Sequence, residues 1–338
     1  MENNKKLNVA VIGCGRISLM HLESCVMLGH NLVAVCDIKE DVAKETAKKY
    51  GCKAYTDYNE MLDSEKLDAV HICLPHYIHC KVARAAIERG VAVLCEKPMD
   101  ISYEVAEETV KFAEERGVLF GIIFQCRYNN SAQLVKRAYE EGKLGKILSA
   151  RSVLTWNRAN DYYVGSDWKG TWDKEGGGVV IDQAIHSIDL VNWIVNSKIK
   201  SVRAALSKHG NKLCDVEDTA TGVVEYENGT VFGFYCMNNY AVDEPIEIRL
   251  QCEKGKVVFG YDDAYITYND GTTEEAHPGQ DRIDVGGKAY WGFQHTRQIK
   301  QFYAAVMGEE PLDITGREAL KTHKLVCKIY EIGRKTLI

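Results

Sequence analysis

The segment that most restricts how this chain can fold lies at its N-terminus and ends at Asp37. Residues 7–12, Leu-Asn-Val-Ala-Val-Ile, predict a short buried strand, and the turn Gly13-Cys14-Gly15 follows it directly. Helix-compatible sequence then continues to Met27, and residues 32–36 predict a second buried strand. A strand, a glycine turn, a helix and a strand ending in an acid are the fingerprint of a dinucleotide-binding βαβ unit. The pattern predicts the start of a Rossmann-type parallel sheet.

The glycine turn indicates how a dinucleotide would be held. Gly13 would make the tight turn, and Gly15 would admit the pyrophosphate to the positive end of the helix. Ser18 replaces the third glycine of the fingerprint, and its small side chain still allows the helix to pack closely on the strand. The cofactor contacts expected from this segment are Gly13, Gly15, Arg16 and Ile17.

Asp37 indicates which dinucleotide is bound. Its carboxylate would accept hydrogen bonds from the ribose hydroxyls of adenosine, and its charge would repel a 2′-phosphate. The sequence therefore favours NAD, while Lys39, two residues further on, keeps NADP open as the second choice.

Strand and helix patterns continue to alternate as far as residue 124. Such repeated βα units form a doubly wound parallel sheet, in which ligands bind at the carboxyl ends of the strands. We therefore predict a dinucleotide-binding Rossmann domain over residues 1–124. Its further expected strands are 53–56, 67–74, 91–95 and 118–124, and its expected helices are 41–50, 78–89 and 102–116.

Polar residues follow three of these strands, at the edge where a cofactor is expected. Lys97 could be a solvated strand end, or it could orient a substrate hydroxyl and stabilise a developing alkoxide. His79 could approach the nicotinamide or only cap its helix. We expect no metal site, because no cysteine or glutamate signature accompanies the histidines. The cofactor contacts expected at this edge are Leu74, Pro75, His76, His79, Glu96, Lys97 and Gln125.

After residue 124 strand patterns follow one another without helices between them, which predicts antiparallel pairing. Asn228-Gly229 is a strong hairpin signal, and Thr315 with Glu318 forms a capping box for the last helix. We predict a second, α+β domain over residues 125–338, a large open and mainly antiparallel sheet flanked by helices, for substrate binding and oligomerisation. Its expected strands are 146–157, 202–208, 220–226, 231–237, 246–252, 256–259 and 265–268, and its expected helices are 131–141, 294–307 and 316–333.

Three glycines lead into a helical segment, 175–189, that carries three ionisable residues. Asp182, His186 and Asp189 are spaced so that one face of a regular α-helix would carry all three. A histidine beside carboxylates can transfer protons, and glycines could let the backbone approach a flat ligand. The alternative is an ordinary helix start whose polar residues face water. We expect Asp189, a turn beyond His186, to be a supporting residue.

Composition excludes several classes of protein. The formal net charge of −6 does not suit a nucleic-acid binder, which is usually basic. No apolar run approaches the roughly 18 residues of a membrane span, and the chain leads straight into its first strand, so we expect no signal peptide. The twelve cysteines form no Cys-x-x-Cys pair, and many lie in apolar runs. Packed, reduced thiols indicate a cytoplasmic protein.

Three motifs occur together and in order: Gly13-Cys14-Gly15, Glu96-Lys97-Pro98 and Gly177-Gly178-x3-Asp182-x3-His186. This combination resembles the Gfo/Idh/MocA family, the relatives of glucose–fructose oxidoreductase and inositol dehydrogenase, over essentially the whole chain. The resemblance implies an NAD-dependent oxidoreductase that acts on a hydroxyl of a carbohydrate or cyclitol and forms a homodimer or homotetramer. It also implies that the catalytic residues are Lys97, Asp182 and His186, with His186 handling the substrate proton.

Two further segments are similar to parts of family members. Gln125-Cys126-Arg127-Tyr128-Asn129 is similar to an Asn-Arg-Tyr-Asn-type segment, and Tyr162-Tyr163 with Trp168-Lys169-Gly170-Thr171-Trp172 is similar to a segment of members that oxidise C3 of sugars or glycosides. Lys169 departs from the usual arginine, so a bidentate contact is not expected there. The aromatic residues could be core, or could pack against sugar rings. The resemblance adds Trp168 to the cofactor contacts and gives these substrate contacts: Arg127, Tyr128, Tyr162, Tyr163, Trp172, Asp182 and His186.

Three functions remain open from the sequence. The first is an NAD-dependent dehydrogenase that oxidises a secondary hydroxyl, C3 being favoured. The second is a redox-neutral glycosidase or lyase that oxidises C3 transiently, eliminates the C1 group and restores the alcohol with retained NADH. The third is an NAD-binding regulator without catalysis, which the complete set of Lys97, Asp182 and His186 disfavours.

Overall fold

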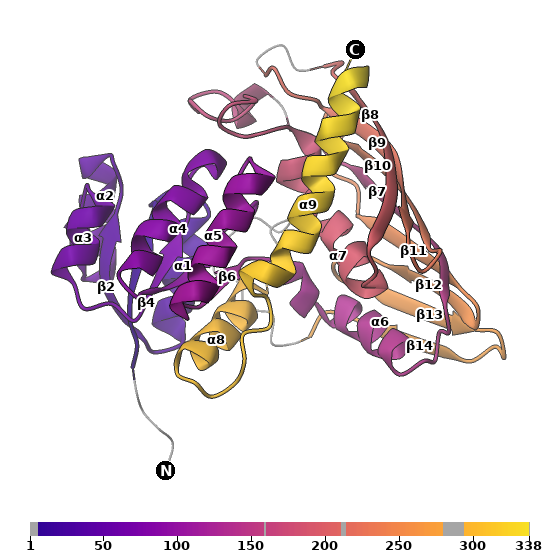
Figure 1. Cartoon of the computed structure of the whole chain (residues 1–338), viewed down its shortest axis with the longest axis horizontal. Coiled ribbons are helices and arrows are strands. Elements are labelled where there is room, and N and C mark those ends of the chain that lie inside the picture. The colour runs from indigo at the N-terminus through magenta and orange to yellow at the C-terminus, as the bar shows by residue number, and fades with distance from the viewer. Residues whose placement is uncertain (1–5, 159, 211–213, 280–293, 338) are drawn as a thin grey trace. The chain divides into compact units, whose positions relative to one another are not determined.

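The computed structural model of the chain describes two compact units (Figure 1). The first is drawn from Met1–Gln125 and Ile283–Leu320, and the second from Cys126–Arg282 and Lys321–Ile338. The chain therefore changes unit next to the predicted domain boundary, but residues 294–320, which the sequence patterns placed in the second domain, belong to the first unit. The residues outside the description are 1–5, 159, 211–213, 280–293 and 338.

The described part of the first unit contains a six-stranded, entirely parallel sheet. The strand order 3-2-1-4-5-6 is that of a doubly wound dinucleotide-binding sheet, whose order reverses between the first and fourth strands. The predicted Rossmann fold is confirmed. In spatial order the strands are β3 (Lys53–Tyr55), β2 (Asn31–Cys36), β1 (Asn8–Ile12), β4 (Ala69–Ile72), β5 (Ala92–Cys95) and β6 (Phe120–Ile122).

One helix of this unit was not predicted. It is α3 (Tyr58–Ser64), which begins after Asp57, whose side chain accepts a hydrogen bond from Asn59 N–H at 2.7 Å. The asparagine and aspartate of this segment suit a turn as well as a helix cap, so its pattern gave no helix signal. The other helices of the unit are α1 (Ser18–Met27), α2 (Glu40–Tyr50), α4 (His79–Glu88), α5 (Tyr103–Arg116) and α8 (His295–Val306).

Helix α8 belongs to the first unit because of its buried apolar side chains. Ile299, Phe302 and Tyr303 form one core cluster with Leu7 and Leu94, residues of the first third of the chain. Burial of large apolar side chains is the main favourable contribution to packing. The unit therefore completes its core with a helix that follows the second unit in sequence.

The second unit contains, among its described residues, an eight-stranded and mainly antiparallel sheet, as predicted. Two features were not expected. Strand β7 pairs in parallel with β10, which the long connection between them permits, and β14 adds an edge strand without an apolar pattern. In spatial order the strands are β14 (Thr273–Ala276), β13 (Ala264–Tyr268), β12 (Gly255–Phe259), β11 (Glu247–Cys252), β7 (Ile147–Thr155), β10 (Val231–Met237), β9 (Thr219–Tyr226) and β8 (Ile199–Ser207).

Figure 1 shows α6 (Asn130–Glu140) and α7 (Ile185–Val195) on one face of this sheet. In β10 the side chains of Phe232, Phe234 and Cys236 are buried, whereas the residues between them are half-buried. This alternation is expected of a sheet that is covered more fully on one face. No helix among the described residues is long and apolar enough to cross a membrane.

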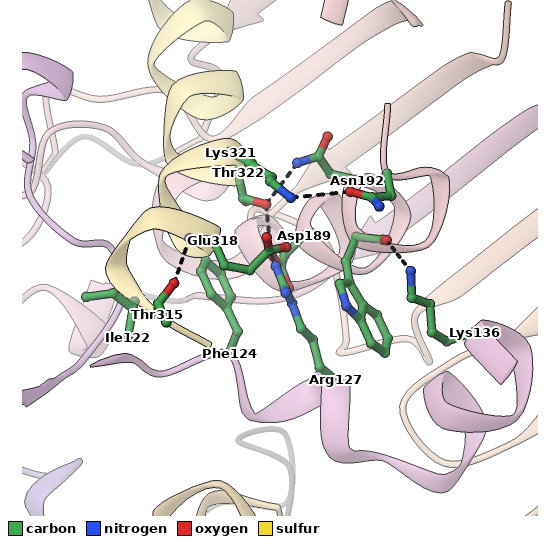
Figure 2. Close-up of polar contacts among 12 residues, drawn as sticks. Ile122, Phe124, Arg127, Lys136, Asp189, Asn192, Thr315, Glu318, Lys321 and Thr322 are labelled. Atoms are coloured by element: carbon green, nitrogen blue, oxygen red, sulfur yellow. Dashed lines mark hydrogen bonds and ion pairs between the residues drawn. The ribbon is translucent and has the colours of Figure 1, made fainter. Parts of the chain in front are cut away.

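The last long helix, α9 (Gly316–Gly333), begins at the predicted cap. Thr315 Oγ1 accepts a hydrogen bond from Glu318 N–H at 3.1 Å (Figure 2). The threonine side chain thus bonds one of the amides that a helix start leaves without an internal partner.

Candidate functional site

The glycine turn of the first unit has the geometry that its sequence predicts. Gly13 has φ +93°, and a Cβ there would overlap the carbonyl oxygen of Cys73 at the end of the neighbouring strand. A Cβ at Gly15 would meet nothing within 4 Å, so the space beside this residue is open. The first glycine is therefore required by the backbone, and the second leaves room at the start of α1. Arg16 is exposed and Ile17 half-buried beside it.

Asp37 lies at the same edge of the sheet as the glycine turn. Its Oδ2 accepts a hydrogen bond from Cys14 N–H at 2.9 Å, and its Oδ1 accepts one from Lys39 N–H at 2.9 Å. The carboxylate is therefore held beside the turn by two backbone amides. The following residue, Ile38, is 88% exposed. Sequence reasoning missed it, although its place directly after the acid was a usable signal.

His79 joins the segments that follow β4 and β5. Its Nε2 is 2.7 Å from the carbonyl oxygen of Leu74, and its Nδ1 is 2.7 Å from that of Pro98, which follows Lys97 in a cis peptide bond. Burial lowers the pKa of His79, against the effect of these two carbonyl contacts. The ring is fully buried, and its two contacts connect the backbone after β4 with the backbone after β5. Its predicted contact with the cofactor stays a prediction.

Glu96 supports Lys97 from inside the first unit. Its Oε1 lies 3.0 Å from His21 Nε2 and 3.4 Å from His295 Nε2, and its Oε2 accepts a hydrogen bond from Lys97 N–H at 3.2 Å. Burial opposes ionisation of Glu96, but the two histidines hold its pKa well below the usual range. This residue was predicted to contact the cofactor, and the structure gives it partners within the protein. Lys97 itself is half-buried at the strand end.

The remaining residues predicted at the cofactor edge differ in exposure. Leu74 and Pro75 are half-buried, whereas His76 and Gln125 are buried. Trp168, which belongs to the second unit, is half-buried. Their contacts with a cofactor stay predictions.

The glycine segment of the second unit is not a regular α-helix. A π-helical turn, Val180–Ala184, precedes α7, and Asp182 lies in that turn while His186 is the second residue of α7. The predicted single α-helical face is therefore wrong, because a π turn has more residues per turn. Such turns are frequent at functional sites, but short-range spacing gives no signal for them.

Asp182 receives several donors from its surroundings. Tyr162 Oη donates to its Oδ2 at 2.5 Å, as does Gln183 Nε2 at 2.5 Å, and Lys169 Nζ lies 3.8 Å from the same oxygen. Burial, and then the charge of Asp182, raise the pKa of Tyr162 well above its usual value. Tyr162 therefore stays protonated, and its hydroxyl is the donor in the hydrogen bond to the carboxylate. His186 is 9% exposed at the start of the following helix.

Lys169 lies over the aromatic residues of this cluster. Its Nζ is 3.6 Å from the ring centroid of Tyr162 and 5.2 Å from that of Trp168. An ammonium above aromatic faces is attracted by the ring quadrupoles. The second unit thus brings Lys169, Tyr162 and Asp182 together. The buried Tyr163 bonds Asn238 from the same region, and Trp172 packs edge-to-face on Tyr330.

Arg127 and Asp189 form a buried ion pair (Figure 2). Arg127 Nε donates to Oδ2 at 2.8 Å and Nη2 donates to Oδ1 at 2.7 Å, while Thr322 Oγ1 donates to Oδ1 at 2.7 Å. Both partners are almost completely buried. Asp189 is thus a supporting residue, as expected, and Arg127 directs two donors to it, although a substrate contact was predicted. Tyr128, also predicted to contact substrate, is half-buried.

The glycines before the π turn pack against other parts of the protein, whereas the sequence predicted that they let the backbone approach a ligand. A Cβ at Gly177 would overlap the side chain of Tyr330, and a Cβ at Gly178 would overlap the carbonyl oxygen of Glu217. The expectation that these glycines admit a flat ligand was therefore wrong, because the space is filled by protein. Glu217 and Tyr330 were missed, since neither has a short-range sequence relation to the motif.

Comparison with known proteins follows the same division of the chain. Residues 7–124 match an oxidoreductase family with an NAD-binding Rossmann fold, and residues 132–258 match the GFO/IDH/MocA C-terminal domain. D-glucoside 3-dehydrogenase of Escherichia coli (strain K12) is 32% identical over 244 residues, 67% of this chain and 68% of that protein. The chain belongs to the Gfo/Idh/MocA family. Its first unit is an NAD-binding Rossmann unit of this family.

Other Gfo/Idh/MocA proteins are similar over comparable lengths. Myo-inositol 2-dehydrogenase of Thermotoga maritima is 27% identical over 236 residues, and the aligned part is 67% of this chain and 66% of that protein. The chain thus matches about two thirds of the length of these curated relatives. The structure of the WlbA dehydrogenase from Chromobacterium violaceum, in complex with NADH and UDP-GlcNAcA, is 28% identical with a TM-score of 0.86. That match covers 98% of this chain and 95% of the solved chain.

Proposed function

We propose that this Gfo/Idh/MocA protein is an NAD-dependent dehydrogenase that oxidises a secondary hydroxyl, preferentially at C3, of a sugar, glycoside or cyclitol. The observation that carries the proposal is Asp182, whose carboxylate is held by Tyr162 and Gln183 one turn before His186. The names of the relatives, a glucoside 3-dehydrogenase and an inositol dehydrogenase, support this substrate class. A structural relative was solved with a bound nucleotide sugar, so nucleotide sugars are included among the candidate substrates.

The proposed reaction converts the carbinol into a ketone. His186 takes the hydroxyl proton as general base, a role worth roughly 10²- to 10⁴-fold in rate. Lys97 stabilises the emerging alkoxide, and Asp182 orients the substrate hydroxyl with the help of Tyr162. The chemistry that NAD would supply, when held by the first unit, is acceptance of the hydride from the carbinol carbon. Alcohol and NAD⁺ thus give ketone, NADH and one proton.

The first unit would hold the cofactor through residues at the carboxyl edge of its sheet. Gly15 would leave the pyrophosphate room at the start of α1, and Asp37 would accept hydrogen bonds from the adenosine ribose. The exposed side chain of Ile38, next to Asp37, would pack against the adenine. The charge of Asp37 favours NAD over NADP.

The test is incubation of the protein with NAD and a panel of hexosides, inositols and nucleotide sugars, following reduced cofactor and released aglycone. We expect NADH formation with at least one member of the panel. The His186→Ala variant should retain NAD binding and lose at least about 100-fold in turnover, the lower range of general-base help. The exposed His277 gives a matched control, His277→Ala, that should leave turnover unchanged. Full turnover by His186→Ala would contradict the assignment of the base.

A redox-neutral glycosidase or lyase is the second candidate, and the Tyr162–Asp182 hydrogen bond favours it. Oxidation at C3 acidifies the C2 hydrogen, so a second acid–base group could eliminate the C1 substituent before NADH restores the alcohol. Free aglycone without net NADH would establish this reaction and contradict simple dehydrogenation. NAD binding without turnover over the whole panel would instead indicate a regulator.

We also propose a homodimer or homotetramer and a cytoplasmic location. The half-buried residues of β10, between its buried ones, support an interface on the open sheet face. No disulfide joins any of the twelve cysteines, all of which lie in the described part of the chain, and this supports a reducing compartment. Analytical ultracentrifugation of the full chain tests the oligomer, and a monomer at micromolar concentration would contradict it.

A further inference from the structure

The Glu217 carboxylate bonds the start of the glycine segment. Its Oε2 accepts a hydrogen bond from Gly178 N–H at 2.8 Å, and its Oε1 accepts one from Val180 N–H at 3.1 Å. The first amides of a helix have no partners within the helix, so they need acceptors from elsewhere. Glu217 is only 1% exposed, and it supplies two of these acceptors from the segment that leads into β9.

Tyr330 of α9 extends the same network. Its hydroxyl donates to Glu217 Oε1 at 2.7 Å and accepts a hydrogen bond from Ile181 N–H at 3.1 Å. Three amides at the start of the π turn are therefore bonded by two side chains from other elements. The close approach of these elements requires Gly177 and Gly178, because a Cβ at either position would overlap them.

We propose that Glu217 and Tyr330 are positioning residues, which fix the π turn so that Asp182 and His186 are presented in their reactive arrangement. The inference rests on the proposed function, since it concerns the placing of those two groups. In this proposal the glycines of the motif have a packing role, because they let the backbone lie directly against Glu217 and Tyr330. Neither positioning residue needs to touch substrate or cofactor.

The ionised form of Glu217 suits the network. A carboxylate accepts at both oxygens, whereas protonation makes one oxygen a donor that faces another donor. Burial raises the pKa of Glu217 to about 7, against the hydrogen bonds from Tyr330 and the two amides. The other titratable groups that influence it, or are influenced by it, are Glu175 and Cys236. The anchoring should therefore weaken as the pH falls through about 7.

The first experiment compares Tyr330→Phe with Tyr226→Phe. The control removes an equally buried tyrosine hydroxyl, which bonds Asn192 near the other end of α7 at 3.3 Å. Tyr330→Phe should lower kcat by on the order of tenfold, as expected for the loss of a buried hydrogen bond. Its NAD dissociation constant should stay unchanged, because the glycine turn belongs to the first unit. Tyr226→Phe should change neither quantity.

The second experiment uses Glu217→Gln, which keeps the shape of the side chain but cannot ionise. In the wild type, the acid limb of log kcat against pH should include the ionisation of Glu217. In the variant, the slope of that limb should fall by one unit, which a merely structural role would not cause. An unaltered acid limb in the folded variant would overturn the inference.

Amide hydrogen exchange separates this inference from the proposed function. Tyr330→Phe should speed exchange of the amides in residues 178–182, and Tyr226→Phe should not. This measurement needs no substrate, so it decides the anchoring even if the wild type turns over nothing. Wild-type exchange rates in folded Tyr330→Phe would refute it, and absence of turnover by the wild type alone would refute only the dehydrogenase proposal.

Discussion

Truncation of the buried Arg127 side chain gives the sharpest test of how the second unit is held together. Arg127→Ala leaves Asp189 buried with the hydroxyl of Thr322 and without its bidentate cation. Breaking a buried ion pair by removing one partner typically costs about 3–5 kcal/mol, because the remaining charge is uncompensated. The two charge-assisted bonds at 2.7–2.8 Å place this pair within that range. We therefore expect Arg127→Ala to lower the free energy of unfolding by about 4 kcal/mol.

Urea unfolding followed by tryptophan fluorescence would measure this loss, because Trp156, Trp168, Trp172 and Trp193 all lie in the second unit. The matched control is Arg151→Ala, whose partner Glu247 lies 2.8 Å away at the surface. An exposed pair of this kind contributes only about 0–1 kcal/mol. Equal losses for the two variants would refute the inference that Arg127 is a structural cation. A stable Arg127→Ala with a raised KM would instead support the substrate contact predicted from the sequence.

Two further predictions concern charge. Asp37→Ser should raise the dissociation constant of NAD about 10- to 100-fold, because charge-assisted hydrogen bonds are lost. The variant should also prefer NAD over NADP by a smaller factor than the wild type does. Isothermal titration calorimetry with NAD and with NADP measures both dissociation constants. An unchanged ratio of the two constants would show that Asp37 does not select between the cofactors. Glu175 is buried, and burial raises its pKa to about 8 from an ordinary 4.5. Because the folded state then binds the extra proton, this carboxyl should make stability fall as the pH rises from about 4.5 to 8. Glu175→Gln should flatten that slope in thermal unfolding measured across this interval, and parallel profiles for wild type and variant would refute the shift.

The sequence was sufficient for the architecture of both units because their strands carry regular apolar patterns. The glycine turn and Asp37 identified the dinucleotide fold, and the order of the six parallel strands confirmed it. Edge strand β14 lacked a signal, since its residues alternate between exposed and half-buried without an apolar face. The parallel pairing of β7 with β10 is set by partners far apart in sequence, which local periodicity does not report.

The sequence proposed residue types for the candidate site but did not predict the local geometry around them. Asp182 and His186 follow a recognisable spacing, whereas the π turn that contains Asp182 has no sequence signature. Glu217 and Tyr330 were invisible because they reach the glycines from other elements. Arg127 was recognised as a special residue, but only the structure shows the carboxylate of Asp189 against it.

The position of α8 has a consequence for synthesis of the protein. Leu7 and Leu94 share a core cluster with Phe302, so the first unit lacks part of its core until the second unit has left the ribosome. Domains usually fold as they emerge, and exposed apolar surface invites aggregation while folding is incomplete. The Rossmann sheet therefore keeps an apolar surface uncovered until α8 is made, and α8 begins 175 residues after the start of β6. A nascent chain that stops before α8 should depend on chaperones far more than the complete protein does.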